Sequence, residues 1–163
     1  MLNATRQVEI TVRSGRDPAT LSRLMATIGS CGTEVLAACS YWDGFDSVMM
    51  FVPEQEAIAI RALEAAGFKC MTHLIVLVET PDQPGLAAAL GGKLTYVGIE
   101  VLYSYSSPRE CDRAYVVFKT TNDFRAMYVL EADALIHDVA AAKNCREPIH
   151  AHSRELHPDQ VAA

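Results

Sequence analysis

The sequence has 163 residues, half of them hydrophobic and 21% charged, with a formal net charge of −6. That length allows one ordinary domain or two very small ones. Lys and Arg form no run, which argues against nucleic acid and against an anionic membrane surface, and no apolar run is long enough to span a bilayer.

The cysteines and the first residues favour the cytoplasm. No apolar stretch follows the start of the sequence, so no signal peptide is predicted. The five cysteines are an odd number, are widely spaced and form no Cys-x-x-Cys pair, as is usual for a reduced compartment.

The chain opens with a predicted strand, turn and helix. Apolar and polar residues alternate from Val8 to Val12, which indicates a half-buried strand. A turn from Ser14 leads to Asp17, a predicted N-cap, and to Pro18, which suits the first helical position. The inward face of the helix has helical spacing and consists of Leu21, Leu24, Met25 and Ile28.

A hairpin, a helix and a strand are predicted next. The strands cover 35–41 and 47–52 and are joined by a turn at Asp43-Gly44. Pro53 opens a helix that runs to about Ala66, and a short strand begins at Phe68.

The second half follows the same order. Residues 74–78 are apolar on both faces, which predicts a central strand. A turn over 80–85 precedes a helix, and the remaining predicted elements are strands at 101–106 and 114–119, a helix at 124–130 and a last strand at 135–139.

Residues 143–163 differ in composition and are interpreted as a surface-hugging or mobile tail. Its histidines could bind zinc with Cys145 or His137, but nothing in the sequence fixes these groups in place. We therefore predict no metal site, and no motif calls for a cofactor; the tail histidines are His150, His152 and His157.

The two halves are copies of one unit. At an offset of 66 residues Pro18 lies over Pro84, and Gly32-Thr-Glu-Val-Leu matches Gly98-Ile-Glu-Val-Leu without a gap. Each copy has the order βαββαβ, the ferredoxin-like plan. We expect units at 1–71 and 72–142, followed by the tail.

One motif in the second copy indicates which family with this ferredoxin-like plan the sequence resembles. Asp82-Gln-Pro-Gly-Leu86 follows a strand, and Gly98-Ile-Glu-Val opens the next one. This pattern resembles the signature of the ACT family; in the first copy Arg16-Asp-Pro-Ala19 replaces the usual turn. The resemblance implies an α+β fold of two ACT units side by side within one chain, with antiparallel sheets that merge into one of eight strands and helices on one face.

The resemblance also implies where a ligand binds: the turn before the first helix of one unit faces the second strand of its partner. An amino acid is the usual ligand. Two candidate sites follow. The first combines Thr80, Asp82, Gln83, Gly85 and Leu86 with Glu34 and Leu36, and the second combines Ser14, Arg16, Asp17 and Ala19 with Glu100 and Leu102.

The chemistry of these turns suits an amino acid. Free N–H groups and the helix dipole attract its carboxylate, and Gly85 permits close approach. Asp82 and Glu100 can accept hydrogen bonds from its ammonium, although family members often have asparagine there. Simpler roles stay open: Gly85 as a turn residue, Asp17 and Asp82 as helix caps, and both Glu34 and Glu100 as exposed strand starts.

We predict a non-catalytic amino-acid sensor that forms homodimers and regulates a separate enzyme or transcription factor. One alternative is a regulatory subunit of an amino-acid biosynthetic enzyme, in the manner of acetolactate synthase small subunits. Others are a small enzyme that uses Glu34 or Glu100, and an assembly module with empty sites. The sequence has no nucleophile motif, no phosphate loop and no HExxH motif.

Overall fold

The computed structural model describes residues 2–15, 17–109 and 113–131. The last predicted strand, at 135–139, and the tail lie outside these ranges. A fourth helix covers 123–131. The other elements are β1 (Asn3–Arg13), α1 (Pro18–Ser30), β2 (Val35–Trp42), β3 (Ser47–Pro53), α2 (Glu56–Ala65), β4 (Cys70–Pro81), α3 (Leu86–Tyr96), β5 (Val101–Arg109) and β6 (Arg113–Thr120).

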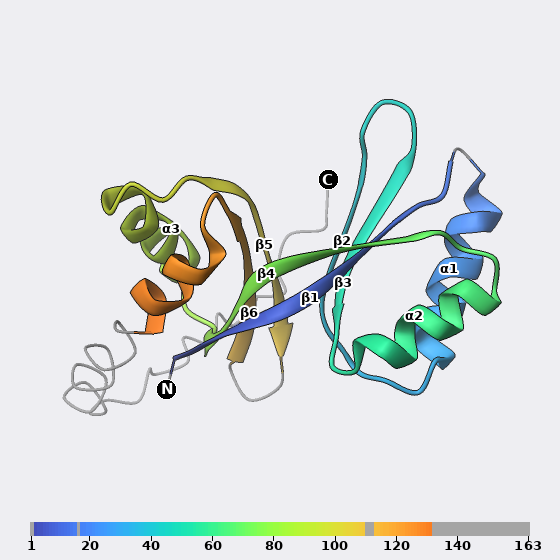
Figure 1. Cartoon of the computed structure of the whole chain (residues 1–163), viewed down its shortest axis with the longest axis horizontal. Coiled ribbons are helices and arrows are strands. Elements are labelled where there is room, and N and C mark those ends of the chain that lie inside the picture. Colours follow the sequence, from blue (N-terminus) through green and yellow to red (C-terminus); the bar gives the residue numbers. More distant parts are fainter. Residues whose placement is uncertain (1, 16, 110–112, 132–163) are drawn as a thin grey trace, which may run out of the picture.

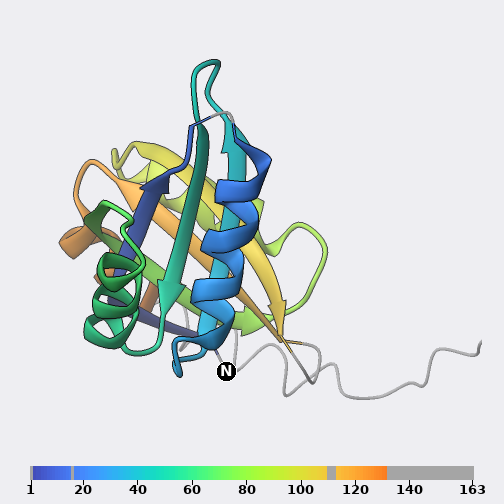
Figure 2. The same ribbon diagram turned by 90° about the vertical axis from the view of Figure 1, so that its right-hand side faces the viewer.

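One antiparallel sheet with helices on one face organises the described residues, so the predicted α+β class is confirmed. The strand order is β2-β3-β1-β4-β6-β5. Even-numbered residues of β1 point to the helices: Ala4 packs in a core with Leu90 of α3, and Ile10 packs in a core with Leu24 of α1. Figure 1 shows these two helical groups at opposite ends of the molecule, and Figure 2 shows α1 and α2 in front of the strands.

The two units share their central strands. β1 pairs with β4 from Asn3 opposite Glu79 to Val12 opposite Cys70. Val8 lies opposite Leu74, its own equivalent in the repeat, so an approximate twofold axis passes through this pair. The long strands cross between the two helical groups in Figure 1.

Among the described residues, this sharing gives a sheet of six strands and not the implied eight. Each unit needs four strand positions, and the six described strands fill all eight, because β1 and β4 each run through both units. The first half of β1 takes the place beside β4 where the fourth strand of the second unit would pair. In place of a short strand from Phe68 and a separate one at 74–78, the structure has one continuous strand, β4, which begins at Cys70. The expected boundary after residue 71 falls inside it.

The helix predicted to open at Pro53 begins later, at Glu56. Pro53 lies opposite Val35 at the end of β3, and the Glu54 N–H donates to the Glu34 carbonyl oxygen at 2.9 Å. The chain therefore stays in the ladder past Pro53, since a proline at a strand end removes no needed donor.

The face of the sheet without helices carries a third core. It includes Ala37, Ile75, Leu77, Tyr115 and Val117. Over this core the two edge strands approach each other, and the Ala38 N–H of β2 donates to the Ser107 Oγ of β5 at 3.1 Å. Within the described part of the chain, no helix is long and apolar enough to cross a membrane.

Candidate functional site

Thr80, near the end of β4, has a buried hydroxyl group without a partner. The residue is 2% exposed, and no described group forms a hydrogen bond with its Oγ1. It stands two residues beyond Val78, on the strand face where Val78 packs in one core with Leu90 of α3. Because an unsatisfied buried hydroxyl costs about 1–3 kcal/mol, this group requires an explanation.

The turn after Thr80 leads to an uncapped helix. Gly85 is the N-cap of α3, with a left-handed φ of 82°, and no side chain within the described ranges caps the helix. The Leu86 N–H donates to the Gln83 carbonyl oxygen at 3.2 Å, while Asp82 and Gln83 are exposed. A helix N-terminus without a capping side chain attracts an anion through its N–H groups and its dipole.

The equivalent turn of the first unit is satisfied by its own side chains. The Ala19 N–H and the Thr20 hydroxyl both donate to the Asp17 carboxylate, each at 3.0 Å, so the predicted N-cap is confirmed. Ser14, the equivalent of Thr80, donates from Oγ to the Ser47 carbonyl oxygen at 3.3 Å. Arg16 lies outside the described residues.

Glu34 and Glu100 each lie immediately before a strand, β2 and β5, and have equivalent surroundings. Both are exposed, and their carbonyl oxygens accept equivalent bonds, Glu34 from the Glu54 N–H at 2.9 Å and Glu100 from the Thr121 N–H at 3.0 Å. Leu36 is half-buried, whereas Leu102 is 55% exposed.

The start of β2 lies near the end of β4. Leu36 of the first unit and Glu79 of the second line one pocket of about 180 Å³. This pocket belongs to the face without helices, and Asp82, Gln83 and Gly85 do not line it. The structure thus brings Leu36 close to the residue before Thr80, but no hydrogen bond or ion pair between described residues joins Glu34 to the 82–86 turn.

A buried carboxylate in the sheet was not predicted from the sequence. Glu9 is fully buried, and its two oxygens accept from the hydroxyls of Tyr103 at 2.6 Å and Tyr105 at 2.8 Å. Burial, together with the adjacent Glu9, raises the pKa of both tyrosines well above the ordinary value of 10. This cluster ties β1 of the first unit to β5 of the second.

The comparisons with known sequences give no family. No protein-family model matches the chain, and neither does any curated protein.

Solved structures are similar in fold. BT0572 from Bacteroides thetaiotaomicron has a TM-score of 0.65 at 20% identity, covering 82% of this chain and 90% of that one. The regulatory subunit of aspartate kinase from Thermus thermophilus, in its ligand-free form, has a TM-score of 0.57 at 15% identity, covering 79% and 93%. Aspartate kinase from Synechocystis has a TM-score of 0.60 at 16% identity, covering 85% of this chain and 26% of the enzyme. The likeness shows an ACT-like fold, as the sequence resemblance implied.

Proposed function

We propose that the chain is a non-catalytic regulatory protein that binds an amino acid, or a similar small metabolite, between its two units. The first candidate site is proposed to hold the ligand, chiefly through the turn before α3. The observation that carries this proposal is the buried Thr80 hydroxyl, which lacks a described partner close to the uncapped N-terminus of α3.

Each part of an amino acid has a complementary group there. Its carboxylate accepts from the N–H groups that begin α3 and from the Thr80 hydroxyl, and the left-handed Gly85 lets the backbone approach. Asp82 accepts from the ammonium group. Leu86, which is half-buried and packs on the helix side of the sheet, contacts the ligand side chain, whereas Leu36 packs on the other face.

The second candidate site has a structural role in this proposal. The Asp17 carboxylate occupies the place at the N-terminus of α1 that a ligand carboxylate would take. A bound anion would meet like charge there, which disfavours binding.

A regulated enzyme is the expected partner. The similarity to a regulatory subunit of aspartate kinase supports a role as a separate regulatory subunit of an amino-acid biosynthetic enzyme. In such a subunit the ligand acts by binding two conformations unequally. Co-purification of the tagged full chain with such an enzyme, together with a change in that enzyme's activity when the chain and amino acid are added, tests this role.

We further propose that the chain is a cytoplasmic homodimer. The full chain is expected to sediment as a homodimer, and sedimentation velocity at several concentrations tests this. If the chain sediments as a monomer at every concentration, the homodimer proposal is wrong, but the proposed ligand site is unaffected.

Calorimetric titration of the full chain against the standard L-amino acids tests the ligand site. We expect heat from at least one of them, with about tenfold weaker binding in Thr80→Val and unchanged binding in the matched variant Ser14→Ala. No heat and no thermal shift from any amino acid, or equal effects of the two variants, would contradict the proposal.

A further inference from the structure

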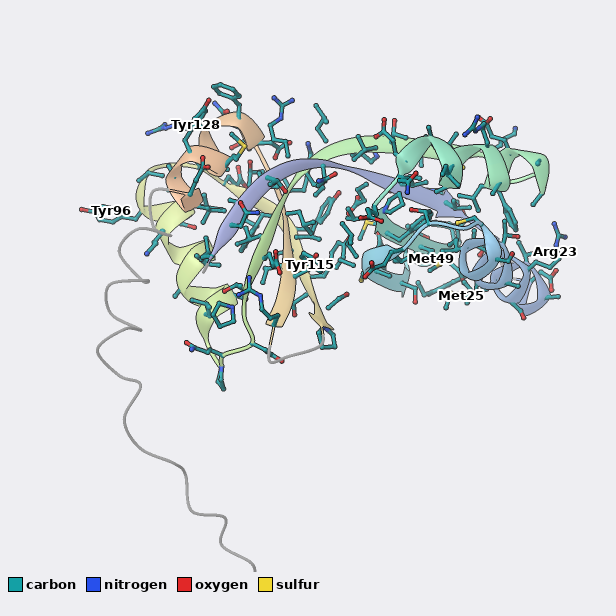
Figure 3. All side chains as sticks on the ribbon, turned by 90° about the horizontal axis from the view of Figure 1, so that it is seen from below. Arg23, Met25, Met49, Tyr96, Tyr115 and Tyr128 are labelled. Carbon is teal, nitrogen blue, oxygen red and sulfur yellow. The ribbon has the colours of Figure 1, made fainter. Side chains whose placement is uncertain are left out.

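The pocket beside Leu36 has its own chemistry, separate from the turn before α3. It opens on the sheet face without helices, where Leu77 of β4, Leu36 of β2 and Tyr115 of β6 supply its apolar lining. Figure 3 shows Tyr115 in the middle of the molecule, between the two helical groups. The pocket therefore lies at the joint of the two units, on the side of β4 opposite to Thr80.

Polar side chains of β1 face this apolar lining. Asn3, Thr5 and Gln7 line the pocket at alternate positions of one strand. In the sheet Asn3 lies opposite Glu79 and Thr5 lies opposite Leu77. None of the three polar side chains takes part in a hydrogen bond with another described residue, so their amide and hydroxyl groups can both donate to and accept from a ligand.

The charges at the pocket are already paired. The Arg113 Nε donates to the Glu79 Oε1 at 3.1 Å, and both side chains are 27% exposed. A ligand with a net charge would compete with one member of this pair for the other. The lining thus favours a molecule without net charge.

The pocket is small and partly open to solvent. A volume of about 180 Å³ is below the range of roughly 300–1,000 Å³ that is usual for drug-sized ligands. It equals the liquid volume of about six water molecules, which suits a molecule as large as a small amino acid.

We propose that this pocket is a second small-molecule site, which binds a net-neutral polar molecule of amino-acid size. The ligand places a short apolar part against Leu36, Leu77 and Tyr115, and exchanges hydrogen bonds with Asn3, Thr5 and Gln7. Because β1, β2, β4 and β6 all line the pocket, its occupant links both units.

The repeat supplies a matched control. At the offset of 66 residues, Gln7 corresponds to His73 and Thr5 corresponds to Met71. His73 is exposed on the same strand face as Leu77 but does not line the pocket. A substitution at His73 shows whether the same kind of change outside the pocket also alters binding.

Calorimetry in the Thr80→Val background separates this site from the proposed function. The probes are L-valine and L-glutamine, which are net-neutral, against L-aspartate and L-lysine, which carry net charge. We expect a neutral probe to bind Thr80→Val, to bind about tenfold more weakly when Gln7→Leu is added, and to be unaffected by His73→Leu. Circular dichroism verifies that each variant is folded.

The outcomes distinguish the two sites. If the wild type binds an amino acid and Thr80→Val binds neither neutral probe, the pocket inference fails and the proposed function stands. If Thr80→Val binds like the wild type and Gln7→Leu removes binding in both backgrounds, the pocket stands and the proposed function fails. Equal binding of charged and neutral probes, or equal effects of Gln7→Leu and His73→Leu, would also overturn the pocket inference.

Discussion

Ser14 and Thr80 hold the same position in the two units, but their hydroxyl groups have different surroundings. Ser14 donates to the Ser47 carbonyl oxygen, and Thr80 is buried with no hydrogen-bond partner among the described residues. The helix beyond Ser14 is capped by Asp17, whereas no described side chain caps the helix beyond Thr80. Duplication has thus left one turn complete and the other with unused donors.

The ligand-free stability of two variants should reflect this difference. Replacing a buried hydroxyl that has no partner removes a desolvation cost, so Thr80→Val is expected to raise the free energy of unfolding by about 1 kcal/mol. Ser14→Ala loses a hydrogen bond and should lower it by about 1 kcal/mol. Urea denaturation measures both, and a loss of stability in Thr80→Val equal to that in Ser14→Ala would mean that the hydroxyl is satisfied.

Gly85 should tolerate a side chain poorly. A Cβ added at Gly85 would meet no atom within 4 Å, but the residue has a left-handed φ of 82°. The loss of stability in Gly85→Ala therefore comes from backbone strain alone and is expected to be about 1–2 kcal/mol. Gly92, inside α3, has an ordinary helical φ and open space for a Cβ. Gly92→Ala should therefore raise the free energy of unfolding by about 1 kcal/mol. Denaturation curves that move in the same direction for both variants would refute this account of the turn.

Leu2 should behave as a core residue in spite of its place near the start of the chain. It is 5% exposed and packs with Val76 and Leu90 in the core of the second unit. Leu2→Ala is therefore expected to cost about 2–5 kcal/mol, as large-to-small core substitutions do. A cost below about 0.5 kcal/mol, the usual limit for surface positions, would indicate that β1 does not complete the second unit.

High pH should weaken the contact between β1 and β5. The pKa of Tyr103 and of Tyr105 is raised in the folded protein, chiefly by burial and also by Glu9. A group with a raised folded pKa contributes stability that is fully present below its unfolded pKa, here about 10, and that is lost as the pH rises above it. The melting temperature should therefore fall above about pH 10.

The double variant Tyr103→Phe, Tyr105→Phe is the control for this pH effect. It should be less stable at neutral pH, because Glu9 loses both hydrogen bonds, and it should lose less stability between neutral and alkaline pH. Thermal unfolding followed by circular dichroism measures both effects. If the double variant shows the same fall in melting temperature at alkaline pH as the wild type, other groups cause that fall.

Local patterns in the sequence predicted much of the fold. Alternation predicted the strand at 8–12, and helical spacing predicted α1, although Met25 of the predicted inward face is 54% exposed. The Asp17 cap and the turn at Gly85 are where capping and turn rules place them. These rules act over a few residues. The 66-residue repeat then indicated two similar units.

The joint between the units could not be predicted in the same way. Residues 3–7 are mostly polar, so the first half of β1 carries no alternating apolar signal, and its pairing with residues 75–79 is long-range. For the same reason Asn3, Thr5 and Gln7 were not expected in a pocket. Glu9 looked like a solvent-facing strand position, and it is buried because Tyr103 and Tyr105 of a distant strand cover it.

An amide NMR titration tests the central claim most directly, since it locates the ligand on the chain. An amino acid that gives heat with the full chain should shift the amide signals of residues 86–88, at the start of α3. The signals of Ala19 and Thr20, at the capped start of α1, should remain in place. Shifts at Ala19 and Thr20 without shifts at 86–88 would contradict a ligand bound at the turn of the second unit.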